Sequence, residues 1–359
     1  MKNYLKISIF AFVITTLAAC SSADHGSMAQ AELNITYPAA YVINGESSSI
    51  SVINLATNNV TETIKLGDSG AVHGSKDMIM FPHHITLSAD AMNLAIGVPG
   101  VDLSAGHTGG AAHTGMQGKI VVVDATKGTI KHNVTTPLMN HNAIYSPDGK
   151  EIWTTQMDNS GKCLVYDATT LTLKNTIIVG MQPAEITISQ DKQYAFVANG
   201  GSNSVTVIKI ADKTVVKTIA VGEDPVGAWT GSDNKMYVDN EKGKTISIID
   251  VATLSVVETI NLGFTPGYAT YNAVLNELWV SNAGSNKVIY FQRMNNAWMK
   301  MGEILTGADA HAITFTKDGQ TAYITNQGAA SVSVINAATK TKIKDIVVGT
   351  KPNGIVIKQ

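Results

Sequence analysis

The feature of this sequence that most constrains its fold is a short β-branched run that occurs seven times. Each run has about five residues, mostly Val and Ile, and the runs end at Asn54, Asp124, Asp167, Lys209, Asp250, Gln292 and Asn336. From Asp124 onward these ends are 41 to 44 residues apart, whereas the first interval is 70 residues. A unit of this length, repeated this often, is typical of four-stranded propeller blades. We therefore predict an all-β chain that folds as a seven-bladed β-propeller, with extra residues in one early repeat.

The order of features within each repeat predicts four strands per blade. An inner strand such as 185–189 is followed by a turn, by a second strand such as 195–199, by the recurring run and by a fourth strand. A Pro often opens the next repeat, and Pro is tolerated there because no ladder N–H is needed at a strand start. The repeats begin near Tyr41 with what resembles strands two to four, and residues 352–357 resemble a lone inner strand. We expect this last strand to complete the first blade and remove the open edges.

The second strands carry a recognisable motif. Residues 41–44, 196–199, 237–240, 279–282 and 323–326 read Tyr-Val-Ile-Asn, Phe-Val-Ala-Asn, Tyr-Val-Asp-Asn, Trp-Val-Ser-Asn and Tyr-Ile-Thr-Asn. This pattern resembles the Tyr-Val-Thr-Asn (YVTN) repeat of a family that includes surface-layer-like and YncE-like β-propellers. The resemblance covers nearly all of residues 41–357 and implies the propeller fold. It leaves function open, because such propellers carry many functions.

The N-terminal residues predict an exported lipoprotein. Lys2 and Lys6 precede an apolar stretch that is too short to span a membrane, and the stretch ends in Leu-Ala-Ala-Cys at Cys20. This ending resembles a bacterial lipobox, although an ordinary signal peptide with a coincidental Cys would look similar. We expect a signal peptide over 1–19, a tether over 20–36 that is lipidated at Cys20, and a propeller over 37–359. Ser21 favours the outer over the inner membrane, and both the periplasm and the cell surface remain open.

Net charge and cysteine content limit the binding partners and the disulfides that we expect. The net charge is −2 with both signs mixed along the chain, so no basic face is visible and nucleic acid is not an expected partner. If Cys20 carries lipid, Cys163 cannot form a disulfide within a monomer. Cys163 stands where sister repeats have Ile or Val, which predicts a buried packing role. We expect a monomer whose lipid is its membrane attachment.

Histidines gather at one aligned position of the repeat. The residue that opens the inner strand is, in chain order, His83, His141, Ala184, Val226, Gly267, His311 and Asn353. His84 follows His83 and would replace it if the register were shifted by one residue. Ring closure makes the blades of His311, Asn353, His83 and His141 neighbours. Two long insertions, 68–81 and 99–118, connect to the same face and carry His73, His107 and His113.

This arrangement predicts a transition-metal site at one mouth of the propeller. His83, His84, His141 and His311 would be the ligands, and His73, His107 and His113 would lie on covering loops. A single rim histidine is more often a hydrogen-bonding surface residue, so it is the aligned set that favours a site. Imidazole suits Cu, Zn and Fe, and nearby thioethers of Met78, Met80, Met116 and Met139 favour copper.

Other chemistries fit the sequence less well. The His pattern resembles the propeller of nitrous oxide reductase, whose inner-rim histidines hold a multi-copper cluster, but Ala184, Val226 and Gly267 stand where further ligands would be needed. A lactonase-like metal site could draw on Glu185, Asn142 and Asn353, without a persuasive carboxylate set. Non-covalent haem on a rim histidine is a further alternative. The sequence has no Gly-x-Ser-x-Gly elbow and no Cys-x-x-Cys-His motif.

Three functions remain compatible with the sequence. The leading hypothesis is an extracytoplasmic binding protein for a transition metal or a metal-bearing ligand. The second is a non-catalytic scaffold or surface protein that binds another protein. The third is a copper- or haem-dependent redox enzyme, so catalysis is undecided and the sequence leans against it.

Overall fold

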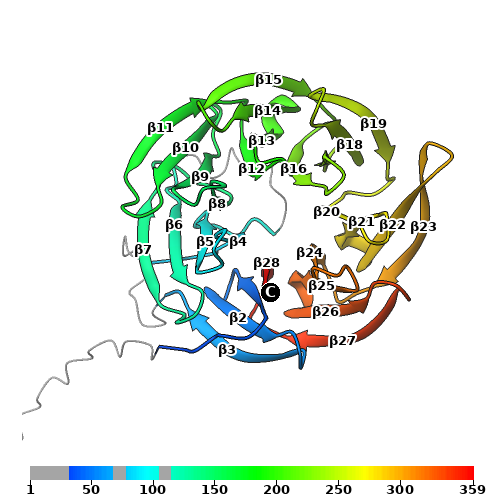
Figure 1. The fold of residues 1–359 in the computed structure, drawn as a ribbon, viewed down its shortest axis with the longest axis horizontal. Coiled ribbons are helices and arrows are strands. Elements are labelled where there is room, and N and C mark those ends of the chain that lie inside the picture. The colour runs from blue at the N-terminus through cyan, green and yellow to red at the C-terminus, as the bar shows by residue number, and fades with distance from the viewer. Residues whose placement is uncertain (1–31, 68–77, 105–114) are drawn as a thin grey trace, which may run out of the picture.

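The computed structural model describes residues 32–67, 78–104 and 115–359. These residues form seven four-stranded antiparallel sheets, arranged as blades around a central channel (Figure 1). The helical content of the described residues is three single turns, Gly200–Ser202, Ala283–Ser285 and Gln327–Ala329. The predicted all-β, seven-bladed propeller is therefore confirmed. The described part of the chain contains no helix that is both long enough and apolar enough to cross a membrane.

Each blade contributes one strand to each of four concentric positions around the channel. From blade 1 to blade 7, the inner strands are β28 (Pro352–Lys358), β4 (Ile85–Leu87), β8 (Ala143–Tyr145), β12 (Pro183–Ile188), β16 (Pro225–Thr230), β20 (Tyr268–Asn272) and β24 (Ala310–Phe315). In the same order, the second strands are β1 (Ala39–Asn44), β5 (Asn93–Val98), β9 (Glu151–Gln156), β13 (Tyr194–Asn199), β17 (Lys235–Asn240), β21 (Glu277–Asn282) and β25 (Thr321–Asn326).

The outer half of each blade follows the same order. The third strands are β2 (Ser49–Asn54), β6 (Lys119–Asp124), β10 (Lys162–Asp167), β14 (Ser204–Lys209), β18 (Thr245–Asp250), β22 (Lys287–Met294) and β26 (Ser331–Asn336). The fourth strands are β3 (Asn59–Lys65), β7 (Ile130–Thr135), β11 (Leu173–Ile178), β15 (Thr214–Ala220), β19 (Ser255–Asn261), β23 (Ala297–Leu305) and β27 (Thr341–Val347).

The ring closes through its last strand, as the sequence predicts. β28 pairs antiparallel with β1, so that Tyr41 lies opposite Val356 and Ala39 lies opposite Lys358. In Figure 1 the red β28 lies beside the channel and completes the blue blade at the N-terminal end of the chain. Blade 1 therefore combines both ends of the propeller, and its β1 edge is covered.

Burial explains why the recurring runs are apolar throughout instead of alternating. The second and third strands are buried on both faces, because each blade packs between two neighbours. The fourth strands are mostly exposed, because they form the outer rim. Cys163 is fully buried between Trp153 and Ile186 of neighbouring blades, so the predicted packing role is confirmed. Burial also raises the pKa of its thiol.

The final Asn of the second-strand motif has a structural role. The side-chain Nδ2 of this Asn donates a hydrogen bond of 3.0 or 3.1 Å to a hydroxyl on the third strand of its own blade. The pairs are Asn44–Ser51, Asn199–Thr206, Asn240–Ser247 and Asn326–Ser333. All four Asn residues are fully buried, so these bonds give partners to Nδ2 groups that would otherwise be costly to desolvate.

Candidate metal centre

The structure places the aligned histidines at one level of the channel. Ile85, Ala143 and Ile313 each pair with the fourth residue of their second strand. His83, His141 and His311 stand two residues before these positions, so they share one level in blades 2, 3 and 7. Phe81 and Asp309, two residues before His83 and His311, have positive φ angles of 49° and 61°. This left-handed residue turns the chain into the inner strand and points the following residues to the channel.

His83, His84, His141 and His311 form one compact group, which we call the histidine cluster. The ring centroid of His83 lies 4.5 Å from those of His84 and His141 and 6.0 Å from that of His311. The His84 and His141 rings are stacked at 5.3 Å. The side chains are buried: His83 is 1% exposed and His141 is 0% exposed. Both alternatives for the register, His83 and His84, therefore enter the same group.

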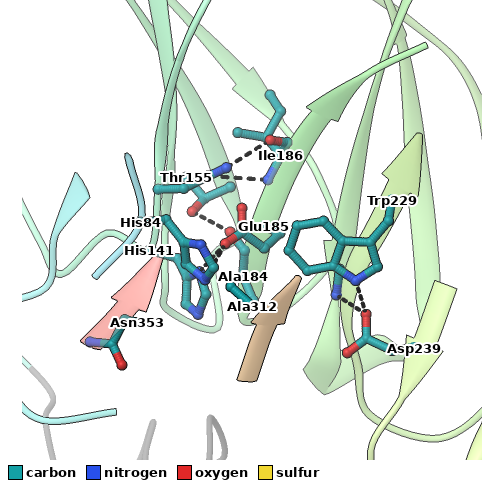
Figure 2. A network of polar contacts seen from close by, with 12 residues as sticks. His84, His141, Thr155, Ala184, Glu185, Ile186, Trp229, Asp239, Ala312 and Asn353 are labelled. Carbon is teal, nitrogen blue, oxygen red and sulfur yellow. Dashed lines mark hydrogen bonds and ion pairs between the residues drawn. The ribbon is translucent and has the colours of Figure 1, made fainter. Parts of the chain in front are cut away.

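Glu185 joins this group from the neighbouring blade 4. Its Oε1 lies 3.0 Å from His84 Nε2 and 2.9 Å from His141 Nδ1 (Figure 2). The carboxylate is 1% exposed, so contacts such as those with these imidazoles offset the cost of its desolvation. Thr155 of blade 3 donates a hydrogen bond of 2.6 Å to the carbonyl oxygen of Ala184, which fixes the backbone beside Glu185 (Figure 2).

The cluster offers two sets of metal ligands. The ligand atoms of His83, His84 and His311 lie within 4.8 Å of one another, and so do those of His84, His141 and Glu185. Nitrogen and oxygen atoms bound to one tetrahedral ion at about 2.0–2.2 Å lie roughly 3.3 Å apart. The 2.9 and 3.0 Å separations around Glu185 Oε1 are within a few tenths of an ångström of that value. Two of the three separations in the set of His84, His141 and Glu185 are therefore close to those around one ion, and the third is within 4.8 Å.

The methionines are placed differently from the histidines. Met78, Met80 and Met116 line a cavity of about 160 Å³ together with Lys119 and Thr135, and none of the four clustered histidines belongs to that lining. Met139 is buried in an apolar group with Leu103 and other residues. The ligand sets found around the histidines consist of imidazole and carboxylate groups, which suit Zn, Fe and Cu(II) alike.

Part of the second insertion covers the channel at the histidine end. Val101 and Leu103 are buried against Ala184 and Val226, which stand at the level of His83. Asp102 accepts a hydrogen bond from the Lys351 ammonium and ties this segment to blade 1. Burial opposes ionisation of Asp102, but the bonds from Lys351 and Ser104 outweigh it and hold its pKa below the usual range. The predicted residues His73, His107, His113 and Cys20 lie outside the described residues.

A smaller space reaches the cluster from the covered side. It has a volume of about 200 Å³ and is lined by His311, Ser104, Glu241 and Asp309, among others. Burial raises the pKa of Asp309. An acidic lining beside a buried histidine attracts cations.

The larger space lies on the other side, and we call it the channel cavity. It has a volume of about 360 Å³ and runs along the inner strands from His84 and Glu185 to Leu87 and Thr230. Exposure increases in the same direction, because Glu185 is buried whereas Thr230 is exposed. The channel therefore opens at the face opposite the described part of the insertion. This geometry makes His84 and Glu185 the floor of the cavity.

One wall of the channel cavity is aromatic. The rings of Trp229 and Tyr268 lie 3.8 Å apart between centroids, and Trp229 lies 6.1 Å from His84. The indole is held by its Nε1–H, which donates a 2.6 Å hydrogen bond to the Oδ1 of Asp239 (Figure 2). Asp239 is fully buried, and its burial raises the pKa of the carboxyl well above the usual value.

Sequence patterns anticipate some of these residues and not others. Glu185 occupies the same position of the repeat in blade 4 as His84 does in blade 2. This equivalence is the signal that could have placed Glu185 with the histidines. The sequence pointed to it only as part of a carboxylate-based site. Trp229 and Asp239 carried no sequence signal, because the direction of the indole depends on packing across two strands.

Comparisons with known proteins identify the fold. No protein-family model and no curated sequence matches the chain. A functionally unknown protein from Desulfotomaculum acetoxidans matches with a TM-score of 0.68 at 15% identity, over 89% of this chain and 98% of that one. The periplasmic gluconolactonase PpgL of Pseudomonas aeruginosa matches with a TM-score of 0.68 at 13% identity, over 90% and 99%. The dihydro-heme d1 dehydrogenase NirN, in complex with DHE, matches with a TM-score of 0.60 at 13% identity, over 92% and 77%. At these identities the likeness shows a shared β-propeller fold alone.

Proposed function

We propose that this chain is an exported, lipid-anchored propeller of the YVTN kind that binds one transition-metal ion at the inner end of its channel. The observation that carries the proposal is the buried group of His83, His84, His141, His311 and Glu185, contributed by four different blades. Single histidines on a rim have ordinary explanations. Four imidazoles and a carboxylate gathered out of water at one level require mutual compensation, and a cation supplies it.

His84, His141 and Glu185 are the ligand set that we favour. A carboxylate in this set neutralises one positive charge of a divalent ion, which a set of imidazoles alone does not do. Two His and one carboxylate are also a known donor set for zinc and for non-haem iron. Copper, predicted from the sequence on account of the methionines, remains one of three metals to test.

The test is the metal content of the purified full chain after loading with Cu, Zn or Fe in separate samples. We expect near-stoichiometric metal with at least one of them, measured by mass spectrometry after removal of free ions. His141→Ala removes one ligand and should lower the bound metal at least about tenfold, as loss of a ligand or of its partners typically does.

His132→Ala is the matched control for this substitution. His132 lies on the outer strand β7 and is exposed, so its removal should leave the metal content unchanged. Equal metal in the His141→Ala, His132→Ala and unmodified chains would contradict the proposal, as would the absence of bound metal in all three.

A metal-dependent enzyme is a second candidate, favoured by one observation. The channel cavity ends on His84 and Glu185, so an ion held there would face a space large enough for a small molecule.

A further inference from the structure

The channel cavity has a chemical character that selects its ligand. Four threonines line its polar wall, and the hydroxyl hydrogens of three of them are already used. Thr86 donates to the carbonyl of Ala143 at 2.8 Å, and Thr230 donates to that of Ile188 at 2.6 Å. Thr187 donates to the carbonyl of Ala228. Each hydroxyl links one blade to the next, and its oxygen can then only accept a further hydrogen bond.

Two further donors in the wall, on Asn142 and Trp229, are in use as well. The Asn142 amide donates to the carbonyl of Ile186 at 2.8 Å, and its oxygen accepts the Ile186 N–H at 3.2 Å. The indole N–H of Trp229 is used by Asp239. Among the described residues that line the cavity there is no Lys or Arg. Carboxylates and phosphates are bound most strongly by charged donors such as Lys and Arg, and the described wall has none of these.

The aromatic wall is built for contact with a carbon face. A Cβ at Gly227 would lie 2.3 Å from the Trp229 indole, so the absence of a side chain there is what allows the ring to fold across its own strand. The Asp239 carboxyl fixes the ring from behind, because its Oδ1 also accepts the Gly227 N–H at 3.0 Å. A rigid indole beside Tyr268 therefore forms a flat surface next to the cavity floor.

We propose that the channel cavity binds a compact, uncharged, polyhydroxylated molecule, with a carbon face on Trp229 and hydroxyls donating to the threonine oxygens. This inference rests on the proposed metal centre. One hydroxyl oxygen of the ligand would lie next to the ion, beside His84 and Glu185. The same ion would repel a protonated amine, which an aromatic wall with a carboxylate would otherwise attract. The ion therefore favours sugar-like polyols over their amines, and the lack of Lys and Arg in the described wall favours polyols over their acids.

The test uses probes of similar skeleton and different charge on the metal-loaded full chain. The uncharged probes are D-glucose, D-mannose, D-galactose and myo-inositol; D-gluconate is the anion and D-glucosamine the cation. Saturation-transfer NMR gives binding for each. We expect at least one uncharged probe to bind more tightly than both charged ones. Failure of every uncharged probe, or tighter binding of gluconate or glucosamine, would overturn the inference.

Trp229→Ala tests the contact surface. It should weaken binding of the uncharged probe about tenfold or more, through lost aromatic contact, while the metal content stays unchanged. Trp298→Ala is the matched control, since Trp298 lies on the outer strand β23, and it should change neither quantity. Equal binding by both variants would overturn the inference. A measurement without substitution accompanies them: the bound probe should reduce quenching of tryptophan fluorescence by acrylamide in the unmodified chain, and unchanged quenching would count against the site.

The two proposals fail in different ways. A chain that holds no metal but binds an uncharged probe overturns the metal centre and keeps the ligand class. A chain that holds metal at His141 and binds no uncharged probe keeps the metal centre and overturns the ligand class.

Discussion

Gly227 is a position where a single added methyl group should have a large local effect. Its Cβ would lie 2.3 Å from carbon atoms of the buried Trp229 ring, so the indole or the backbone must move. We predict that Gly227→Ala lowers the free energy of unfolding by about 1–3 kcal/mol, the usual range for overpacking. The urea midpoint measures this change. Gly284→Ala is the control, because the nearest atom to its Cβ is 3.8 Å away, and an equal effect there would contradict the packing argument.

The buried carboxyl of Asp239 should make the folded protein less stable as pH rises. Burial raises its folded-state pKa well above the unfolded value of about 3.9. The stability that the neutral carboxyl contributes is therefore fully present below that unfolded pKa and is lost as pH rises through the folded pKa. Asn cannot ionise and keeps an oxygen for the Trp229 N–H. We predict that the stability of Asp239→Asn relative to the unmodified chain increases with pH.

Urea midpoints of both proteins from about pH 2 to 9 check this sign. Asp318→Asn provides a control of opposite sign. Hydrogen bonds from Thr316 and from the backbone N–H of Gln320 lower the pKa of Asp318, so the stability that its charge contributes is present above the unfolded pKa and is lost in acid. A pH-independent difference for Asp239→Asn would contradict the prediction.

The spacing of the repeat was enough to predict some of the individual residues of the candidate metal centre. His83, His141 and His311 could be aligned from the sequence because equivalent positions of a propeller repeat lie at the same level of the channel. Glu185 was not joined to them, because it stands one residue later in a blade whose aligned residue is Ala184. Trp229 could not be placed, because its ring crosses its own strand only where residue 227 lacks a side chain.

At the scale of the strand, β28 is the element on which the ring depends. It was predictable because residues 352–357 repeat the inner-strand pattern without the three strands that follow it elsewhere. Its bonds to β1 also bring Gly354 within hydrogen-bond reach of His83, whose carbonyl accepts the Gly354 N–H at 3.0 Å. The closing strand and the candidate metal centre are thus joined directly.

Removal of residues 352–359 should open the ring. β1 would then present an unpaired edge, and we predict aggregation and loss of a single cooperative unfolding transition. Size-exclusion chromatography and urea unfolding measure both effects. Removal of Gln359 alone is the control, because that exposed residue lies outside β28, and it should leave both unchanged. A monomeric, cooperative product of the longer deletion would show that closure is dispensable.

At the scale of the whole molecule, the number and order of blades could be predicted from the spacing of seven short runs. A cover over the histidine mouth could be predicted too, but the contacts of Val101 and Leu103 could not, because these residues lie in an insertion that breaks the repeat. Without a repeating partner, their contacts with Ala184 and Val226 had no pattern to reveal them.

Attachment to a membrane is also a property of the whole molecule. We predict that Cys20→Ser moves the protein from the membrane fraction to the soluble fraction of a bacterial host, because the lipid would be lost. Cys163→Ala is the matched control, since Cys163 is buried in the propeller, and it should remain with the membrane. Immunoblots of the two fractions measure the distribution, and a membrane-bound Cys20→Ser protein would contradict the lipoprotein hypothesis.

The pairing of the first and last strands also determines when blade 1 can be completed during synthesis of the chain. β1 is among the earliest strands to be synthesised, whereas its inner partner β28 emerges only after the six other blades. Blade 1 therefore keeps an open edge until chain elongation is complete. The level of the channel that carries the histidine cluster is likewise completed only with the final residues. A chain that ends before residue 352 would lack the inner strand of blade 1 and the Gly354 contact with His83.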